Sequence, residues 1–192
     1  AWGDSSLYAC GGYSYDLKFW WYFSWPSIIR EKTLPFFKFN VKDKKTGLLV
    51  SINLLEYATI IINFAASIYM LKKYPHLNIN KDPHPVLLNM ADNTSAISWI
   101  IKSSQTNDAG RALSRILCSL QIDSPLGLNG DFLAGSKNIV ADRISRLSPD
   151  YFSSDELSNL FKEFPRLNSC QRFHRSQELV SSILHMLLLE PV

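Results

Sequence analysis

A long apolar segment, residues 48–71, limits what this chain can fold into. Its length and composition would suit a membrane-spanning helix, but it contains Asn53, Glu56 and Asn63, and a carboxylate in the middle of a bilayer is costly. We therefore expect a buried amphipathic helix that begins near Asn53 and ends at about Lys73. With 192 residues, 46% of them hydrophobic, the chain can bury one substantial core around this helix.

The order of the other expected elements favours an α/β fold. Aromatic strands come first, at residues 2–15 and 19–25, and a lysine-rich connection that we interpret as a surface insertion follows at 26–47. Strands then alternate with helices, with strands at 48–52, 86–91 and 130–134 and helices at 53–73, 92–101, 109–121 and 138–146. This order predicts a sheet of mixed direction flanked by helices. Residues 148–192, with helices at 153–164 and 176–189, form a helical extension or linker outside the sheet.

Charge and cysteine content constrain the function only slightly. The net charge of +3 permits contact with nucleic acid without demonstrating it. Cys10, Cys118 and Cys170 lie far apart and form no Cys-x-x-Cys pair, which argues against a zinc site or a disulfide framework and favours a reducing, intracellular setting. The four histidines also lack the spacing of a zinc motif.

Four acidic residues stand at the edges of apolar segments, and they are Asp4, Glu56, Asp92 and Asp142. Carboxylates that are brought together from separate elements repel one another unless divalent cations neutralise them. Hard cations such as Mg²⁺ prefer oxygen ligands. The set therefore indicates a metal site that serves phosphoryl chemistry.

Each of these residues also has a purely structural interpretation. Asp92 could cap the helix that follows it, and Glu56 could return a hydrogen bond to Asn53 in a capping box. Asp142 could form an ion pair with a neighbouring arginine of its helix, and Asp4 could be a turn residue. No one of the four is specific by itself.

The motifs around the four carboxylates resemble, in order, those of a known family. These motifs are Asp4-Ser5-Ser6 with Gly11-Gly12, Asn53-Leu54-Leu55-Glu56, Ala91-Asp92-Asn93-Thr94-Ser95-Ala96, and Gly135-Ser136-Lys137-Asn138 leading to Ala141-Asp142 and Ser145-Arg146. They are similar to the motifs of ribonuclease H domains in retroelement (retrotransposon) reverse transcriptase polyproteins. The resemblance covers residues 1–147.

This resemblance implies a fold, an activity and a set of partners. The fold is a ribonuclease H-like, five-stranded mixed sheet in which the four carboxylates hold two Mg²⁺ ions, with Mn²⁺ as a substitute. The activity is hydrolysis of the RNA strand of RNA:DNA hybrids, beside an upstream reverse transcriptase domain of the same polyprotein and without a membrane partner. Contacts to the hybrid are expected from Ser5, Asn93, Thr94, Lys137, Asn138, Arg143 and Arg146.

One position departs from the family pattern. Many members carry a histidine ten residues before the last aspartate, where it assists turnover, and this chain has Phe132 there. The alternative function is a catalytically inactive ribonuclease H-like module that binds nucleic acid or packs against a polymerase, although such a module has no need of mutually repelling carboxylates. The basic residues of the extension form either a further binding element or a solvated surface, and they are Lys162, Arg166, Arg172 and Arg175.

Overall fold

The aromatic N-terminal segment folds into a three-stranded antiparallel meander, because its small and aromatic residues pack on both faces of a pleated surface. Its strands are β1 (Trp2–Ser5), β2 (Ala9–Ser14) and β3 (Phe19–Ser24). The register pairs Asp4 with Gly11 and Gly11 with Tyr22. The computed structural model describes residues 1–39, 50–78, 83–102, 105, 107–124, 126–150 and 155–189, and the side chains of 34–39 are not described.

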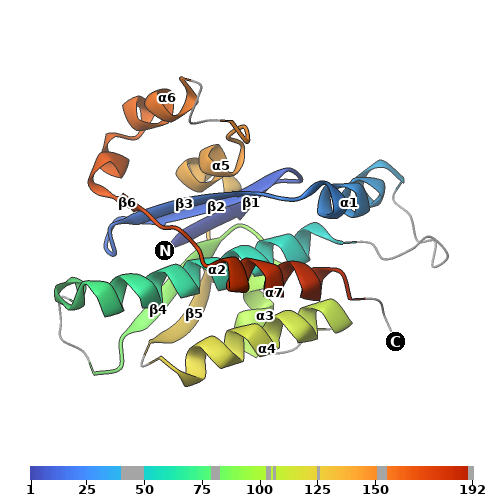
Figure 1. Ribbon diagram of the computed structural model, residues 1–192, viewed down its shortest axis with the longest axis horizontal. Helices are drawn as coiled ribbons and strands as arrows, with labels where there is room; N and C mark the ends of the chain where they lie inside the picture. The colour runs from blue at the N-terminus through green and yellow to red at the C-terminus, as the bar shows by residue number, and fades with distance from the viewer. Residues whose placement is uncertain are drawn as a thin grey trace.

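Three parallel pairings extend the meander into a mixed sheet (Figure 1). β4 (Val86–Ala91) lies parallel to β1, and β5 (Gly127–Phe132) lies parallel to β4. On the other side, the short β6 (Gln171–Arg172) lies parallel to β3. Across the described residues the strand order is β5-β4-β1-β2-β3-β6. β1, the strand that carries Asp4, therefore lies inside the sheet.

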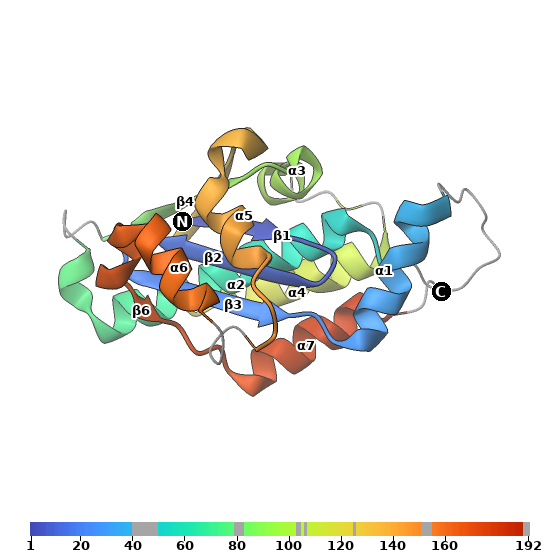
Figure 2. The same ribbon diagram turned by 90° about the horizontal axis from the view of Figure 1, so that it is seen from above.

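Helices cover both faces of this sheet. One face carries α2 (Ile52–Lys73), with α3 (Thr94–Lys102), α4 (Asp108–Ile122) and α7 (Gln177–Leu187) around it (Figure 1). The other face carries α5 (Ile139–Ser145) and α6 (Glu156–Glu163), which lie over β1, β2 and β3 in Figure 2. Helix α1 (Ser27–Phe39) follows β3, and the short 3₁₀ helices are η1 (Pro75–Leu77), η2 (Gly135–Lys137) and η3 (Pro165–Ser169).

Helix α2 is the centre of the core. Residues 54–64 are all buried. The helix has the length and the composition of a membrane span, with a mean hydropathy of 1.6 over its apolar window, but 78% of that window is buried inside the fold. The expected buried helix is confirmed. It is not amphipathic, however, because the sheet, α3 and α4 together surround it.

Close contact between α2 and the sheet requires glycine on two adjacent strands. A Cβ atom at Gly3 would lie 2.7 Å from Asn63 Nδ2, and one at Gly12 would lie 2.3 Å from Asn63 Oδ1. The Asn63 side chain accepts a hydrogen bond from Trp21 Nε1 over 2.7 Å and donates one to Asn89 Oδ1 over 2.9 Å. A buried amide is stable when it is paired in this way, so this polar chain fixes α2 against the strands.

The bounds of several elements differ from the sequence-based expectations. Val50 and Ser51 belong to the strand expected at 48–52 but are not in a strand, because α2 begins at Ile52. Residues 40–49 lie outside the described residues. The expected connection at 26–47 is not irregular throughout, since residues 27–39 form α1. The expected last strand, at 130–134, lies earlier, at Gly127–Phe132.

The C-terminal extension also differs from its expectation. We expected a helical segment outside a five-stranded sheet, but this segment supplies β6, which gives the described sheet six strands. Its helix α7 packs against α4. The cause is tertiary, because β6 pairs with the edge of β3, and Phe173, which directly follows β6, donates from its backbone nitrogen to Trp20 O over 2.8 Å.

Candidate metal centre

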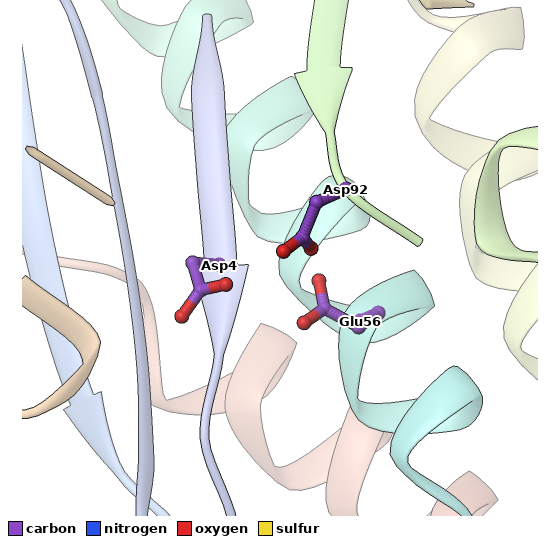
Figure 3. Close-up of side chains that lie close together, drawn as sticks. All are labelled: Asp4, Glu56 and Asp92. Carbon is purple, nitrogen blue, oxygen red and sulfur yellow. The ribbon is translucent and has the colours of Figure 1, made fainter. Parts of the chain in front are cut away.

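Three of the four predicted carboxylates converge at one edge of the sheet (Figure 3). Asp4 is on β1, Glu56 is in an early turn of α2, and Asp92 directly follows β4. Because β1 and β4 are parallel neighbours, their carboxyl ends lie at the same edge, where side chains are open to ligands. One oxygen atom from each residue lies within 4.8 Å of the other two. The structure thus brings together residues that are 36 or more positions apart in the sequence.

Glu56 is the most deeply buried member of this cluster, with 3% of its surface exposed. Its Oε1 accepts a hydrogen bond from the backbone nitrogen of Ser5 over 3.0 Å. Its Oε2 has no hydrogen-bond partner among the described residues. Burial, and then the charge of Asp4, raise the pKa of Glu56 well above its usual range. The capping-box interpretation is wrong, because Glu56 bonds β1 and the residue that precedes the helix is Ser51.

Asp4 is held from the opposite face of the sheet. Its Oδ2 accepts a hydrogen bond from the hydroxyl of Ser145, on α5, over 2.5 Å. Burial raises the pKa of Asp4 to about 6, and the charges of Asp92 and Asp142 act in the same direction, whereas the Ser145 hydrogen bond lowers it. Ser145 belongs to one of the sequence motifs, but no contact with Asp4 was predicted for its hydroxyl. A contact between residues so far apart in the chain has no local signal.

Asp92 is the most accessible of the three carboxylates. Burial and the nearby Asp142 raise its pKa. It is not the cap of α3, because Asn93 fills that position and accepts a hydrogen bond from Ala96 N over 2.9 Å. A Cβ atom at residue 135 would lie 2.8 Å from Asp92 Oδ2, so Gly135 allows the η2 loop to approach this carboxylate.

Asp142 lies beside the cluster and is not a member of it. Its Oδ1 accepts two hydrogen bonds from Arg146, from Nε over 2.8 Å and from Nη2 over 2.6 Å. Its side chain is 40% exposed. The ion-pair interpretation of Asp142 therefore describes this structure, although its charge still acts on Asp4 and Asp92.

Three of the residues expected to contact nucleic acid support the site from within. Ser5 is 7% exposed, and its Oγ accepts a hydrogen bond from Trp25 Nε1 over 3.2 Å. Asn93 donates to Asn53 Oδ1 over 2.9 Å and so joins α3 to α2. Asn138 is 1% exposed and donates to Gly3 O over 3.0 Å. These side chains position the elements that carry the carboxylates.

The other expected contacts lie at the surface. Thr94, Lys137 and Arg146 are exposed, and Arg143 pairs with Glu163 of α6 over 3.4 Å. Phe132 is 50% exposed at the end of β5, and it lies opposite Ala91 in the register, next to Asp92 along the sheet edge. The position that differs from the family is therefore close to the acidic cluster.

The arrangement fits the binding of divalent cations. Three carboxylates within 4.8 Å of one another repel strongly in a partly buried site, and their raised pKa values reflect the cost of ionising them without a cation. The partnerless Glu56 Oε2 is a buried oxygen that a cation would satisfy. Oxygen-only ligands suit Mg²⁺ or Mn²⁺ rather than zinc.

Comparison with known proteins identifies no relative of this chain. No family model, no curated protein and no solved structure matches the chain. The functional assignment consequently depends on the order of the motifs and on the geometry of the acidic cluster.

Proposed function

We propose that this protein is a metal-dependent nuclease that hydrolyses the RNA strand of RNA:DNA hybrids. The observation that carries the proposal is the convergence of Asp4, Glu56 and Asp92 at the carboxyl edge of β1 and β4, with one oxygen of Glu56 buried and unpartnered. The four ordered motifs of the sequence support this class of nuclease over other users of acidic clusters. The same resemblance supports a place beside a reverse transcriptase domain in one polyprotein.

The three carboxylates would hold the cations from three independently anchored elements. Bound cations would activate a water molecule and neutralise charge that develops on the scissile phosphate and the leaving oxygen. Glu56 is fixed by the Ser5 backbone, and Asp4 is fixed by Ser145, so neither carboxylate has to reorganise when a cation binds. Asp92 is the most accessible of the three carboxylates, and its side chain points toward Asp4 and Glu56 (Figure 3).

Two observations favour the catalytically inactive module as a second candidate. Asp142 is engaged by two hydrogen bonds from Arg146, and Phe132 stands where many family members carry a histidine. In an active enzyme we expect Asp142 to exchange Arg146 for a cation. In an inactive module the ion pair would persist when Mg²⁺ is added.

Cleavage of a labelled hybrid during titration with Mg²⁺ tests the proposal. We expect metal-dependent cutting of the RNA strand that is lost in Asp92→Asn and retained in the matched control Asp123→Asn, which changes an exposed aspartate directly after α4. Single-stranded RNA, duplex RNA and duplex DNA of the same sequence establish the substrate class. A folded protein that binds the hybrid and never cuts it, and whose melting temperature does not respond to Mg²⁺, would identify the inactive module.

A further inference from the structure

A cavity adjoins the acidic cluster. It has a volume of about 360 Å³ and lies between the β1–β2 turn, the end of β3, α1 and the segment that follows α5. Ser145 lines it, and this is the residue whose hydroxyl donates to Asp4. Figure 2 shows α1 at the end of the sheet toward which β1 and β3 point. The cavity and the acidic cluster therefore share one wall.

Two arginine side chains line this cavity, and Arg30 has no carboxylate partner among the described residues, whereas Arg146 is paired with Asp142. Arg30 of α1 and Arg146 both line it, and no carboxylate is among the described residues that line it. Arg30 Nε is buried and has no hydrogen-bond acceptor within the described part of the chain. A charged donor without an acceptor is costly in a buried position, and an anion in the cavity would remove that cost.

The neighbouring hydroxyl groups separate into occupied and available donors. Ser6 Oγ donates to Ala9 O over 3.0 Å, and Ser148 Oγ donates to Glu156 Oε1 over 2.7 Å, so both are engaged. The hydroxyls of Ser24 and Tyr8 make no hydrogen bond to the residues that the structure describes, and Tyr8 is 58% exposed.

Arg146 belongs to the cavity and to the acidic cluster together. Its Nε and Nη2 bond Asp142, and its remaining nitrogen, Nη1, is left for a ligand. An anion beside Arg146 would compete with Asp142 for the guanidinium. An anion in the cavity would therefore weaken the ion pair between Arg146 and Asp142.

We propose that this cavity binds a backbone phosphate of the nucleic-acid strand that is cut, at a nucleotide next to the scissile one. The inference rests on the proposed function. It assigns Arg30 as the principal phosphate ligand, with Arg146 and the hydroxyls of Ser24 and Tyr8 as further donors. The ligand class is a phosphodiester, because two guanidinium groups with neutral donors suit one diffuse negative charge.

The affinity of Arg30→Gln for an RNA:DNA hybrid tests the assignment. The variants are made in an Asp92→Asn background, so that the hybrid stays intact, and Arg115→Gln, an exposed arginine on α4, is the matched control. We expect about tenfold weaker binding for Arg30→Gln and a salt dependence that is reduced by about one phosphate contact. Arg30→Lys should recover part of the affinity, and Arg115→Gln should leave both quantities unchanged. Equal affinity of Arg30→Gln and its parent would overturn the inference.

Hybrids with one neutral methylphosphonate linkage locate the phosphate. We expect the parent protein to bind more weakly when the methylphosphonate is at one position next to the cut site. Arg30→Gln already lacks this contact, so the same methylphosphonate should not weaken its binding further. If every position weakens both proteins equally, Arg30 does not bind a backbone phosphate. Cleavage by the protein with Asp92 restored is a separate measurement. If the protein cleaves the hybrid in a metal-dependent way and Arg30→Gln does not change the affinity for the hybrid, only the phosphate site is overturned. If Arg30→Gln weakens binding and no cleavage is detected, only the proposed nuclease activity is overturned.

Discussion

The hydroxyl of Ser145 donates a hydrogen bond to Asp4 Oδ2 over 2.5 Å and so joins α5 to the middle of the sheet. The same hydroxyl also lies 2.9 Å from Asp142 O, within its own helix. Asp4 is thus oriented by a helix on one face of the sheet, while Glu56, on the helix of the other face, accepts a hydrogen bond from the backbone nitrogen of the adjacent Ser5. The acidic cluster is held between the two helical layers.

Removal of this hydroxyl should change the ionisation of Asp4. The hydrogen bond favours the charged carboxylate, so in Ser145→Ala we expect the pKa of Asp4 to rise further and the protein to lose on the order of 1 kcal/mol of stability. The pH at which Mg²⁺-dependent cleavage reaches half its maximum should therefore move upward. Ser181→Ala, an exposed serine of α7, is the control and should change neither quantity. An unchanged pH profile in Ser145→Ala would show that the hydrogen bond does not tune Asp4.

The metal-free protein should lose stability as the pH rises. Burial raises the pKa of Asp4 from 3.8 to about 6, so between these values the folded state binds a proton that the unfolded chain has released. The free energy of unfolding should fall by on the order of 3 kcal/mol across this window, and Glu56, whose pKa is also raised, adds to the fall at higher pH. Urea denaturation at pH 4, 6 and 7.5 in the presence of a chelator measures this effect. Asp4→Asn should flatten the profile, and a wild-type profile that rises over the same window would contradict the assigned shift.

Mg²⁺ should restore stability only where the carboxylates are ionised. At pH 7.5 the cation removes their mutual repulsion, whereas at pH 4 protons already do so. We expect a clear rise of the melting temperature with Mg²⁺ at pH 7.5 and almost none at pH 4. Addition of excess chelator should reverse the rise. A similar rise at both pH values would indicate that Mg²⁺ binds elsewhere.

Glu56→Gln should stabilise the metal-free protein while it abolishes metal binding. The amide oxygen can still accept the hydrogen bond from Ser5, but the buried charge next to Asp4 is removed. We expect a higher melting temperature in chelator at pH 7.5, together with loss of the Mg²⁺ response and of cleavage. Glu178→Gln, at an exposed position of α7, is the matched control and should behave as wild type. A fall in stability without metal would mean that Glu56 is held by more than the Ser5 contact.

Gly135→Ala should weaken metal binding with little loss of stability. The added Cβ atom would lie 2.8 Å from Asp92 Oδ2, so either the side chain or the loop must move. We expect a several-fold weaker response to Mg²⁺ with a change in unfolding free energy of less than about 1 kcal/mol, because the residue is exposed. Calorimetric titration with Mg²⁺ measures the affinity, and Ser136→Ala in the same loop provides the comparison. Equal affinities of the two variants would show that the loop yields without disturbing Asp92.

The sequence was most informative where local pattern and final structure coincide. β4 was predicted with the bounds that it has, Val86–Ala91, because a short apolar run is followed by a cluster of capping residues. The positions of Asp4, Glu56 and Asp92 followed from the motifs and from their places at the edges of apolar segments. These features are encoded within a few residues.

The structural features that the sequence did not predict depend on contacts between residues far apart in the chain. Asn53 was predicted to cap the helix, but the residue that precedes the helix is Ser51. The Asn53 side chain instead accepts a hydrogen bond from Asn93, forty residues later. β6 has only two residues, which is too short for an alternating pattern in the sequence, and it is a strand because it pairs with β3. The hydrogen bond between Ser145 and Asp4 crosses 141 positions. Local propensity cannot anticipate such pairings, since tertiary contacts supply their stability.

The glycines at positions 3 and 12 bear on the chemistry although neither has a side chain to contribute. Each sits where a Cβ atom would collide with the Asn63 side chain of α2, so a larger residue would disturb the packing of this helix, which also carries Glu56, against β1 and β2. The distance between Asp4 and Glu56, two carboxylates of the acidic cluster, therefore depends on the absence of side chains at two positions on adjacent strands. Larger residues in place of these two glycines should therefore reduce the proposed activity more than the loss of many side chains at the surface would. Some inactivating substitutions should thus lie at positions that contact neither a cation nor the substrate.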